Sequence, residues 1–159
     1  MSAKTLTIDS SSSVATFSVK KVGFITVKGT LSDFSGQITF DKEDLHNSSF
    51  EVSVNTNTIK TDSAKRDEHL RNQDFFDINN YSKISFKSTS IEISGTQFKA
   101  LGNLTILETT KPIEIPFNYD NGIFSGHFSI NRLDYLLGQK FPSLIVGKTI
   151  QISISCKTK

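Results

Sequence analysis

The chain has 159 residues and a formal net charge of +2, from 18 basic and 16 acidic residues. This length predicts one domain that can bury a hydrophobic core, and we interpret residues 1–159 as that domain. The near balance of charge offers no clustered basic face, so we expect no nucleic-acid partner. The only cysteine is Cys156, which excludes a disulfide framework and a CxxC metal site.

The N-terminal stretch MSAKTLTIDSSSSVATFSV has no apolar core after its lysine. We therefore identify no signal peptide in it. No apolar run approaches the ~20 residues that a membrane-spanning helix needs. The sequence as given predicts a soluble, cytoplasmic protein, and a periplasmic location is the alternative if a signal has been removed.

Most of the chain alternates apolar and polar residues with a period of two, which is typical of strands that bury one face. In chain order the alternating runs are ATFSVK, GQITFD, SFEVSVN, KISFKS, NLTILE, KPIEIPFNY, GHFSIN and KTIQISISC. Together with a segment near residues 24–31, they make about nine strand candidates.

Turn signals separate these runs. Asn121-Gly122 predicts a hairpin, because a type I′ turn needs a positive φ at both central positions. Gly95 and the segment Ser32–Gly36 predict two more turns, and Ser10–Ser13 a turn after a short first strand. Strands joined in this way are antiparallel, and a barrel removes their free edges by closing. We predict an all-β fold, an antiparallel barrel of about eight strands.

The aromatic residues are 13 Phe, three Tyr and no Trp. Phe carries no polar group, so a core built from it is purely apolar. An eight-stranded barrel either fills its interior with side chains or holds one small ligand. The alternation shows which side chains face inward, but it leaves both alternatives open.

The segment KRDEHLRNQDFFD, residues 65–77, interrupts the alternation. It contains no Gly or Pro, and the preceding Thr61, Asp62 and Ser63 favour a helix start. We predict one short helix near residues 62–74, lying against one end of the barrel. Its apolar contacts would be Leu70, Phe75 and Phe76, and it would be either a plug or a lid.

Charged residues of this helix are the candidates for chemistry. Asp67 and Arg71 have the i, i+4 spacing of a helical ion pair. Asp67, Glu68 and His69 invite an acid–base interpretation, but neighbouring residues on a helix point in different directions. No zinc-protease, nucleophile-elbow, phosphate-loop or EF-hand motif is present. We predict no catalytic residue, no metal site and no cofactor, and favour a solvated helix.

Several blocks, in order, resemble one family. They are FSVKKVGFITVKGTLSDFSGQITFD, SFEVSVNTNTIKT, KRDEHLRNQDFFD, YSKISFKST, LGNLTILETTKPI and INRLDY. Their order is similar to that of the YceI-like family of polyisoprenoid-binding proteins over nearly the whole chain. The stretch from Thr61 to Phe86 is the most specific part of the match.

The resemblance implies a lipocalin-like barrel, extended along its axis, with an apolar tunnel for isoprenoid lipids such as quinone tails or polyprenols. It also implies a homodimer. Arg132, Asp134 and Tyr135 match a late family element, which we interpret as a structural ion pair or turn. The chain departs from the family at Ser12 and Lys21, where relatives often carry His.

The residues expected to line the tunnel come from the inward faces of the strands and from the helical block. They are Phe17, Val19, Ile38, Phe40, Val52, Val54, Leu70, Phe75, Phe76, Ile84, Phe86, Leu104, Ile106, Phe117, Phe128 and Ile130. Their predicted function is the binding, storage or transport of a polyisoprenoid or similar long apolar lipid. Two alternatives remain: a lipid- or small-molecule-modifying enzyme that uses Asp67, Glu68 and His69, and a ligand-free stress or interaction barrel.

Overall fold

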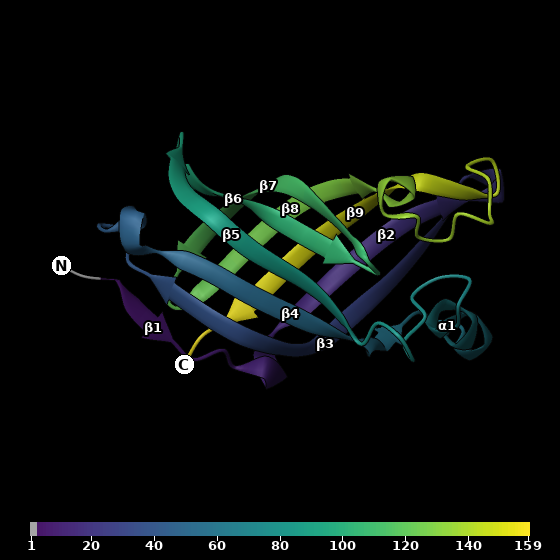
Figure 1. Cartoon of the computed structure of the whole chain (residues 1–159), viewed down its shortest axis with the longest axis horizontal. Coiled ribbons are helices and arrows are strands. Elements are labelled where there is room, and N and C mark those ends of the chain that lie inside the picture. Colours follow the sequence, from purple (N-terminus) through teal and green to yellow (C-terminus); the bar gives the residue numbers. More distant parts are fainter. Residues whose placement is uncertain (1–2) are drawn as a thin grey trace.

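The structure, a computed structural model, describes residues 3–159 and is built almost entirely of strands (Figure 1). The strands are β1 (Lys4–Leu6), β2 (Val14–Lys21), β3 (Ile25–Phe40), β4 (Ser49–Lys60), β5 (Lys83–Ser94), β6 (Gln97–Ile106), β7 (Thr109–Asp120), β8 (Ile123–Asn131) and β9 (Val146–Lys157). Within the described range the one α-helix is α1 (Ala64–Arg71). It lies at the opposite end of the molecule from β1 (Figure 1).

The strands form a closed antiparallel barrel. Neighbouring strands follow the order β3-β2-β9-β8-β7-β6-β5-β4, and pairing between β3 and β4 closes the ring. The short strand β1 pairs with the end of β3, from Lys4 opposite Phe40 to Leu6 opposite Ile38. β1 and β2 therefore pair with different parts of the same side of β3. The predicted antiparallel barrel of about eight strands is confirmed, and its closure leaves no long edge unpaired.

Two of the three predicted turns that contain glycine are found where the sequence predicts them. Asn121 (φ 48°) and Gly122 (φ 81°) join β7 to β8 with the positive φ angles of a type I′ turn. Gly95 (φ 61°) lies in the tight turn between β5 and β6, where Ser94 pairs with Gln97.

The predicted turn at Ser32–Gly36 is wrong, because this segment lies inside the 16-residue strand β3. Its turn-like composition instead marks a distortion of the strand. Asp33 (φ 58°) and Gly36 (φ 117°) have positive φ angles, and the register with β4 shifts around Ser32 and Phe34. Bulges of this kind bend a strand without ending it, which lets one long strand wrap around the barrel.

The predicted short helix near residues 62–74 is found as Ala64–Arg71, so it starts slightly later and ends earlier than predicted. Ser63 caps its N-terminus, where the Oγ atom accepts a hydrogen bond from the backbone N–H of Arg66 at 3.2 Å. Helical backbone stops after Arg71, because Asn72 has an extended conformation. The segment 72–78 that follows is held by turn hydrogen bonds, and it carries Phe75 and Phe76 towards the barrel.

The predicted ion pair between Asp67 and Arg71 does not form. The buried carboxylate of Asp67 accepts hydrogen bonds from the backbone N–H (2.8 Å) and the hydroxyl (2.6 Å) of Thr61. Arg71 donates to the carbonyls of Asn57 and Ile59 at the end of β4. Both side chains therefore attach α1 to neighbouring backbone, and this local geometry takes the place of the intrahelical pair.

Aromatic rings fill the barrel at the end away from α1. We call this cluster the aromatic plug, and neighbouring ring centroids in it lie 4.7–6.2 Å apart. Its members are Phe40, Phe50, Phe98, Phe117, Tyr119 and Phe124. Edge-to-face and tilted arrangements dominate, as expected for packed aromatic rings. This end of the barrel is solid, so any internal space must lie nearer to α1.

Candidate functional site

A cavity of about 730 Å³ lies inside the barrel. All eight strands from β2 to β9 contribute to its wall, together with α1 and the segments that follow α1 and β8. Phe50, Phe117 and Phe124 of the aromatic plug form its inner end. The volume falls within the range of roughly 300–1,000 Å³ that is typical of small-molecule sites.

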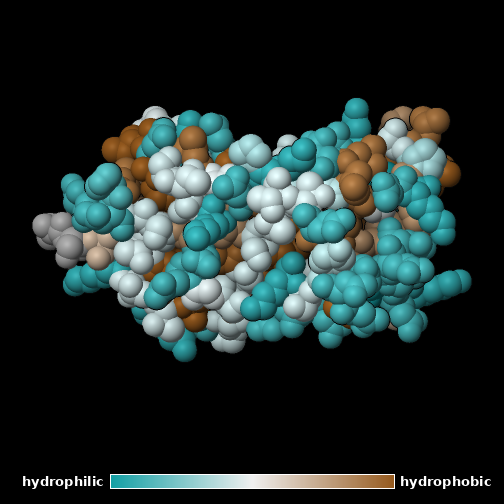
Figure 2. Space-filling model, viewed as in Figure 1, coloured by the Kyte–Doolittle hydropathy of each residue, from teal (hydrophilic) through white to brown (hydrophobic). Residues whose placement is uncertain are grey.

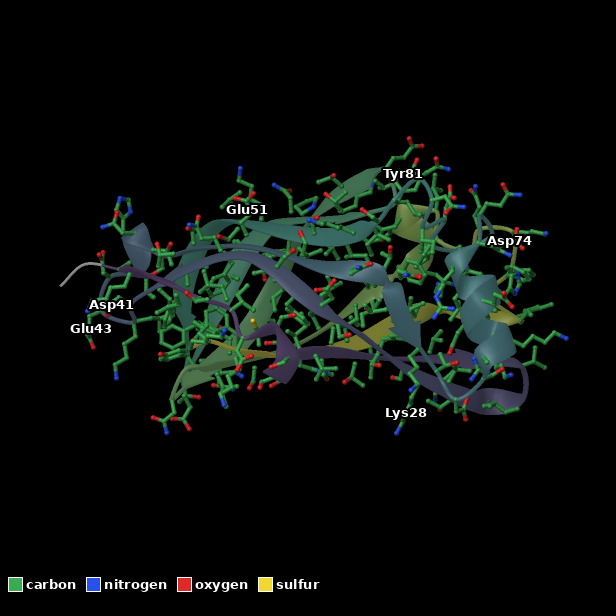
Figure 3. The ribbon with its side chains drawn as sticks, turned by 90° about the horizontal axis from the view of Figure 1, so that it is seen from below. Lys28, Asp41, Glu43, Glu51, Asp74 and Tyr81 are labelled. Atoms are coloured by element: carbon green, nitrogen blue, oxygen red, sulfur yellow. The ribbon has the colours of Figure 1, made fainter. Side chains whose placement is uncertain are left out.

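The burial pattern of the strands also indicates a hollow interior. Phe17, Val52, Ile84 and Phe128 face inward, but they are only partly buried. A side chain on the inner face of a filled barrel would be covered by side chains from the opposite wall. Here the cavity leaves apolar surface uncovered in the middle of the barrel, whereas Glu51 and Lys28 point outward (Figure 3).

All of the residues predicted to line the tunnel lie on the wall of this cavity except Phe40. Phe40 is inward-facing and buried, but its ring packs in the centre of the aromatic plug against Phe98, Tyr119 and Phe124. It therefore helps to close the cavity from behind. Contact of the other residues with a ligand stays a prediction.

Sequence reasoning identified Ile38 but missed the earlier part of β3. Val27, Leu31 and Phe34 line the cavity, but their spacing changes from four residues to three across Asp33. Each bulge adds a residue and moves the alternation to the other face of the strand. A strict period of two therefore cannot identify these positions, although an irregular spacing next to Gly or Asp is a usable signal.

The cavity opens at the end of the barrel that carries α1. Lys21, Val22, Ile25 and Ile145 line the cavity and are also exposed on the surface, whereas the lining residues next to the aromatic plug are mostly buried. We call this opening the mouth. It is bordered by the β2–β3 hairpin, by α1 with the segment after it, and by the 136–145 loop that precedes β9.

A set of contacts, which we call the latch, joins the segment after α1 to the 136–145 loop across the mouth. Its members are His69, Asp74, Phe75, Lys140 and Phe141. Nε2 of His69 lies 2.8 Å from Oδ2 of Asp74, and Nζ of Lys140 lies 3.5 Å from Oδ1. The rings of Phe75 and Phe141 stack with centroids 5.1 Å apart. The latch contains few, partly exposed contacts, so we expect it to open more easily than the barrel wall.

The latch should depend on pH through Asp74. The hydrogen bond with His69, and then the charge of Lys140, lower the pKa of the Asp74 carboxyl below its ordinary value, and partial burial opposes this shift. A carboxyl with a lowered pKa in the folded protein stabilises it above the ordinary value, near pH 4. This contribution is lost as the pH falls through the lowered pKa.

We expect Asp74→Asn to speed the release of a bound ligand by a factor of about two to five at pH 7, which is the scale of one partly exposed ion pair. Melting temperatures of this variant and the wild type, measured between pH 2 and pH 7, should differ fully above about pH 4 and converge as the pH falls through the lowered pKa of Asp74. Asp134→Asn, at an exposed position outside the latch, is the matched control. Equal release rates for both variants would contradict a role of the latch at the mouth.

Arg132 organises the 136–145 loop from inside. Its side chain is 1% exposed and donates all five of its N–H groups to backbone carbonyls at 2.7–3.0 Å. The acceptors belong to Leu137, Gly138, Phe141, Val146 and Gly147. The predicted ion pair with Asp134 is therefore wrong, and the alternative interpretation as a turn element fits the short 3₁₀ segment Arg132–Tyr135. Burial lowers the pKa of the guanidinium, which has no free donor for a ligand.

The candidate acid–base residues do not come together. Asp67 is buried against Thr61, Glu68 is exposed, and His69 pairs with Asp74 at the mouth. Successive helix positions diverge, which is the reason that the three adjacent residues form no cluster. The Cys156 thiol lines the cavity, and burial raises its pKa, so it is not an activated nucleophile. Within residues 3–159, no group of three or more metal-ligating side chains lies close enough to hold an ion.

Fold and site together define a closed antiparallel β-barrel that encloses an apolar cavity with its mouth beside a single short helix. The model of the YceI-like domain matches residues 6–158, so the chain belongs to the YceI-like family. Protein YceI of Salmonella arizonae is 34% identical over 99 residues, covering 62% of this chain and 52% of that protein. The chain thus spans about half the length of the curated relatives it matches.

Solved structures share the fold. BcnA of Burkholderia cenocepacia superimposes with a TM-score of 0.86 at 22% identity, covering 94% of this chain and 98% of BcnA. A polyisoprenoid-binding domain from Saccharophagus degradans, implicated in plant cell wall breakdown, superimposes with a TM-score of 0.73 at 11% identity. That match covers 99% of this chain and 98% of the domain. In the described part of the present chain, no helix combines the length and apolar character needed to cross a bilayer.

Proposed function

We propose that the chain binds a long, flexible apolar lipid of the polyisoprenoid class inside the barrel and carries or stores it. The observation that supports this most is the apolar cavity of about 730 Å³, closed by the aromatic plug and open at the mouth. A cavity along a barrel suits a linear chain, whose far end would meet the plug while its head group stays near His69 and Arg66 at the mouth. The polyisoprenoid-binding domain with the same fold supports the choice of lipid class.

Burial of the chain would provide the affinity. Each CH₂ group that moves from water into an apolar site contributes up to ~0.8 kcal/mol. Part of this gain is offset by the entropy lost when a flexible chain is ordered. Few polar side chains line the inner wall, because the inward positions of the strands carry mostly apolar residues. We therefore expect loose selectivity for the tail, limited by its length, and selectivity for the head group at the mouth.

The other two functions have weaker support. A catalytic role would need a reactive group in the cavity, but the His69–Asp74 pair belongs to the latch, and Cys156 is not activated. A ligand-free barrel would need side chains that meet in the middle, whereas the inward residues leave a cavity. We accordingly propose a binding protein without enzymatic activity. Its homodimeric state and its cytoplasmic location stay predictions.

Native mass spectrometry of the purified chain, with organic extraction of whatever it carries, tests the proposal. The chain alone has a mass of 17.6 kDa. We expect adducts of one lipid per chain, from the source cells or after incubation with a polyprenol or an isoprenoid quinone. A saturated fatty acid serves as the control for unselective burial of any apolar chain. Comparing the polyprenol with the isoprenoid quinone shows whether the head group affects binding. The same spectra report any dimer.

A clean apo mass after both incubations would overturn the proposal. Binding of the fatty acid in preference to both prenyl lipids would replace the polyisoprenoid class with another apolar chain.

A further inference from the structure

Five exposed apolar side chains form one patch beside the mouth. They are Val22 (56% exposed), Phe24 (88%), Ile25 (54%), Leu144 (89%) and Ile145 (48%). The first three belong to the β2–β3 hairpin and the last two to the 136–145 loop. The loops are joined directly, because the N–H of Val22 donates to the carbonyl of Ile145 at 3.0 Å. We call this patch the apolar tip. In Figure 2, brown atoms gather at the end of the molecule where Figure 1 places these two loops.

The backbone conformation that exposes Phe24 to solvent is strained. Gly23 (φ 79°) and Phe24 (φ 62°) form a turn with two consecutive positive φ angles. Glycine adopts this conformation freely, but a bulky side chain does not, and Asn or Gly would be favoured at the second position. Phe24 gains no burial in return, because it is 88% exposed. Strain combined with an exposed aromatic ring indicates a role outside the fold of the isolated chain.

The two segments that carry the tip are free of acidic residues. No Asp or Glu occurs in residues 10–32 or 135–159. Lys20 and Lys21 precede the hairpin turn, and Lys148 follows the loop, all three with exposed side chains. Asp134 lies ten residues before Leu144 in the chain, and Asp74 is paired with Lys140 of the 136–145 loop. Asp41 and Glu43 lie at the opposite end of the barrel (Figure 3). The tip is therefore an apolar surface with a basic border.

The tip is continuous with the cavity wall. Val22, Ile25 and Ile145 are exposed on the outside and also line the cavity. Apolar surface thus runs from the outermost residues through the mouth into the barrel. If the chain binds lipid as proposed above, a lipid could move along this surface without crossing water.

We propose that the apolar tip docks on the surface of an anionic phospholipid bilayer. Phe24 and Leu144 enter the boundary between head groups and acyl chains, and Lys20, Lys21 and Lys148 face the lipid phosphates. Apolar side chains with a cationic border are the combination that binds such an interface. Docking in this orientation points the mouth at the membrane.

Flotation with vesicles tests the docking, using the wild type and two substitutions. Phe24→Asn removes the ring and places a residue that tolerates the positive φ, so this variant should melt at the same temperature as the wild type or higher. Ile93→Asn is the matched control, because Ile93 is 68% exposed at the far end of β5. We expect binding to vesicles of phosphatidylglycerol and phosphatidylethanolamine. It should weaken at high salt and on pure phosphatidylcholine.

Phe24→Asn should reduce the bound fraction at least about fivefold, and Ile93→Asn should leave it unchanged. The chain has no Trp, so Phe24→Trp gives a single fluorophore whose emission should shift to the blue with anionic vesicles. Absence of wild-type binding would overturn the proposal, as would equal losses in both Asn variants. A dimer that Phe24→Asn dissociates, without vesicle binding, would show that the tip contacts a second copy instead.

Lipid uptake from a dilute ethanol solution, measured by native mass spectrometry, separates this proposal from the proposed function. Uptake without vesicle binding would overturn the docking and leave the lipid-binding function in place. Vesicle binding without uptake would support the docking and contradict the lipid-binding function.

Discussion

Arg132→Met is expected to lower the free energy of unfolding by about 3–5 kcal/mol, which is the scale for removing one partner from a buried charged network. The five carbonyls that accept hydrogen bonds from Arg132 would lose their donors while still enclosed by the 136–145 loop and the start of β9. Methionine fills similar space but supplies no donor. Urea denaturation followed by circular dichroism measures the loss.

Arg132→Lys is the informative control for this expectation. Lysine keeps the positive charge but has three donors at one point, which cannot reach five carbonyls arranged around a planar fork. We expect most of the stability loss to remain. If lysine restored wild-type stability, the charge and not the hydrogen-bond geometry would hold the loop. If Arg132→Met lowered the free energy of unfolding by less than about 1 kcal/mol, the 136–145 loop would contribute little to the cooperative unfolding of the barrel.

Ile152→Trp is expected to abolish or strongly weaken lipid binding without unfolding the barrel. Ile152 lies between Phe17 and Phe128 in the neighbouring strands, and it lines the cavity. An indole ring here would enter empty space. A ligand that gave up only about two buried CH₂ groups would bind about tenfold more weakly, and a blocked chain should lose more.

Gln151→Trp is the matched control, because Gln151 is the preceding residue of β9 and its side chain is exposed on the outer face. Each variant carries one Trp in a chain that otherwise has none. Emission should therefore be blue-shifted for Ile152→Trp and not for Gln151→Trp. Binding of a polyprenol is measured by titration, and melting temperature confirms folding. Unchanged affinity in a folded Ile152→Trp variant would place the ligand elsewhere.

The parts of the fold that were predictable depend on local physics. Alternation in GHFSIN placed Phe128 and Ile130 on the inner face of β8, because a strand has a period of two whatever surrounds it. Asn121-Gly122 marked a hairpin because few other residues tolerate its backbone angles. The same reasoning failed at Ser32–Gly36, since residues that form turns also form bulges.

Contacts between distant segments were not predictable. Asp74 and Lys140 approach each other from positions 66 residues apart, and nothing local to either residue marks the pair. The 136–145 loop has no periodic pattern, so its attachment to Arg132 and its place at the mouth had no signal in the sequence. The exposed conformation of Phe24 likewise depends on a turn that its residue type does not favour.

The sequence by itself determined the β-barrel class, the inward side chains of the regular strands and the position of the one helix, because periodicity, turn chemistry and capping act over a few residues. Only the tertiary structure decided that the barrel is hollow, that Phe40 belongs to the aromatic plug, and where the mouth opens. Whether side chains from opposite walls meet depends on the diameter of the closed ring and on the packing of all its strands together. No short stretch of sequence contains that information.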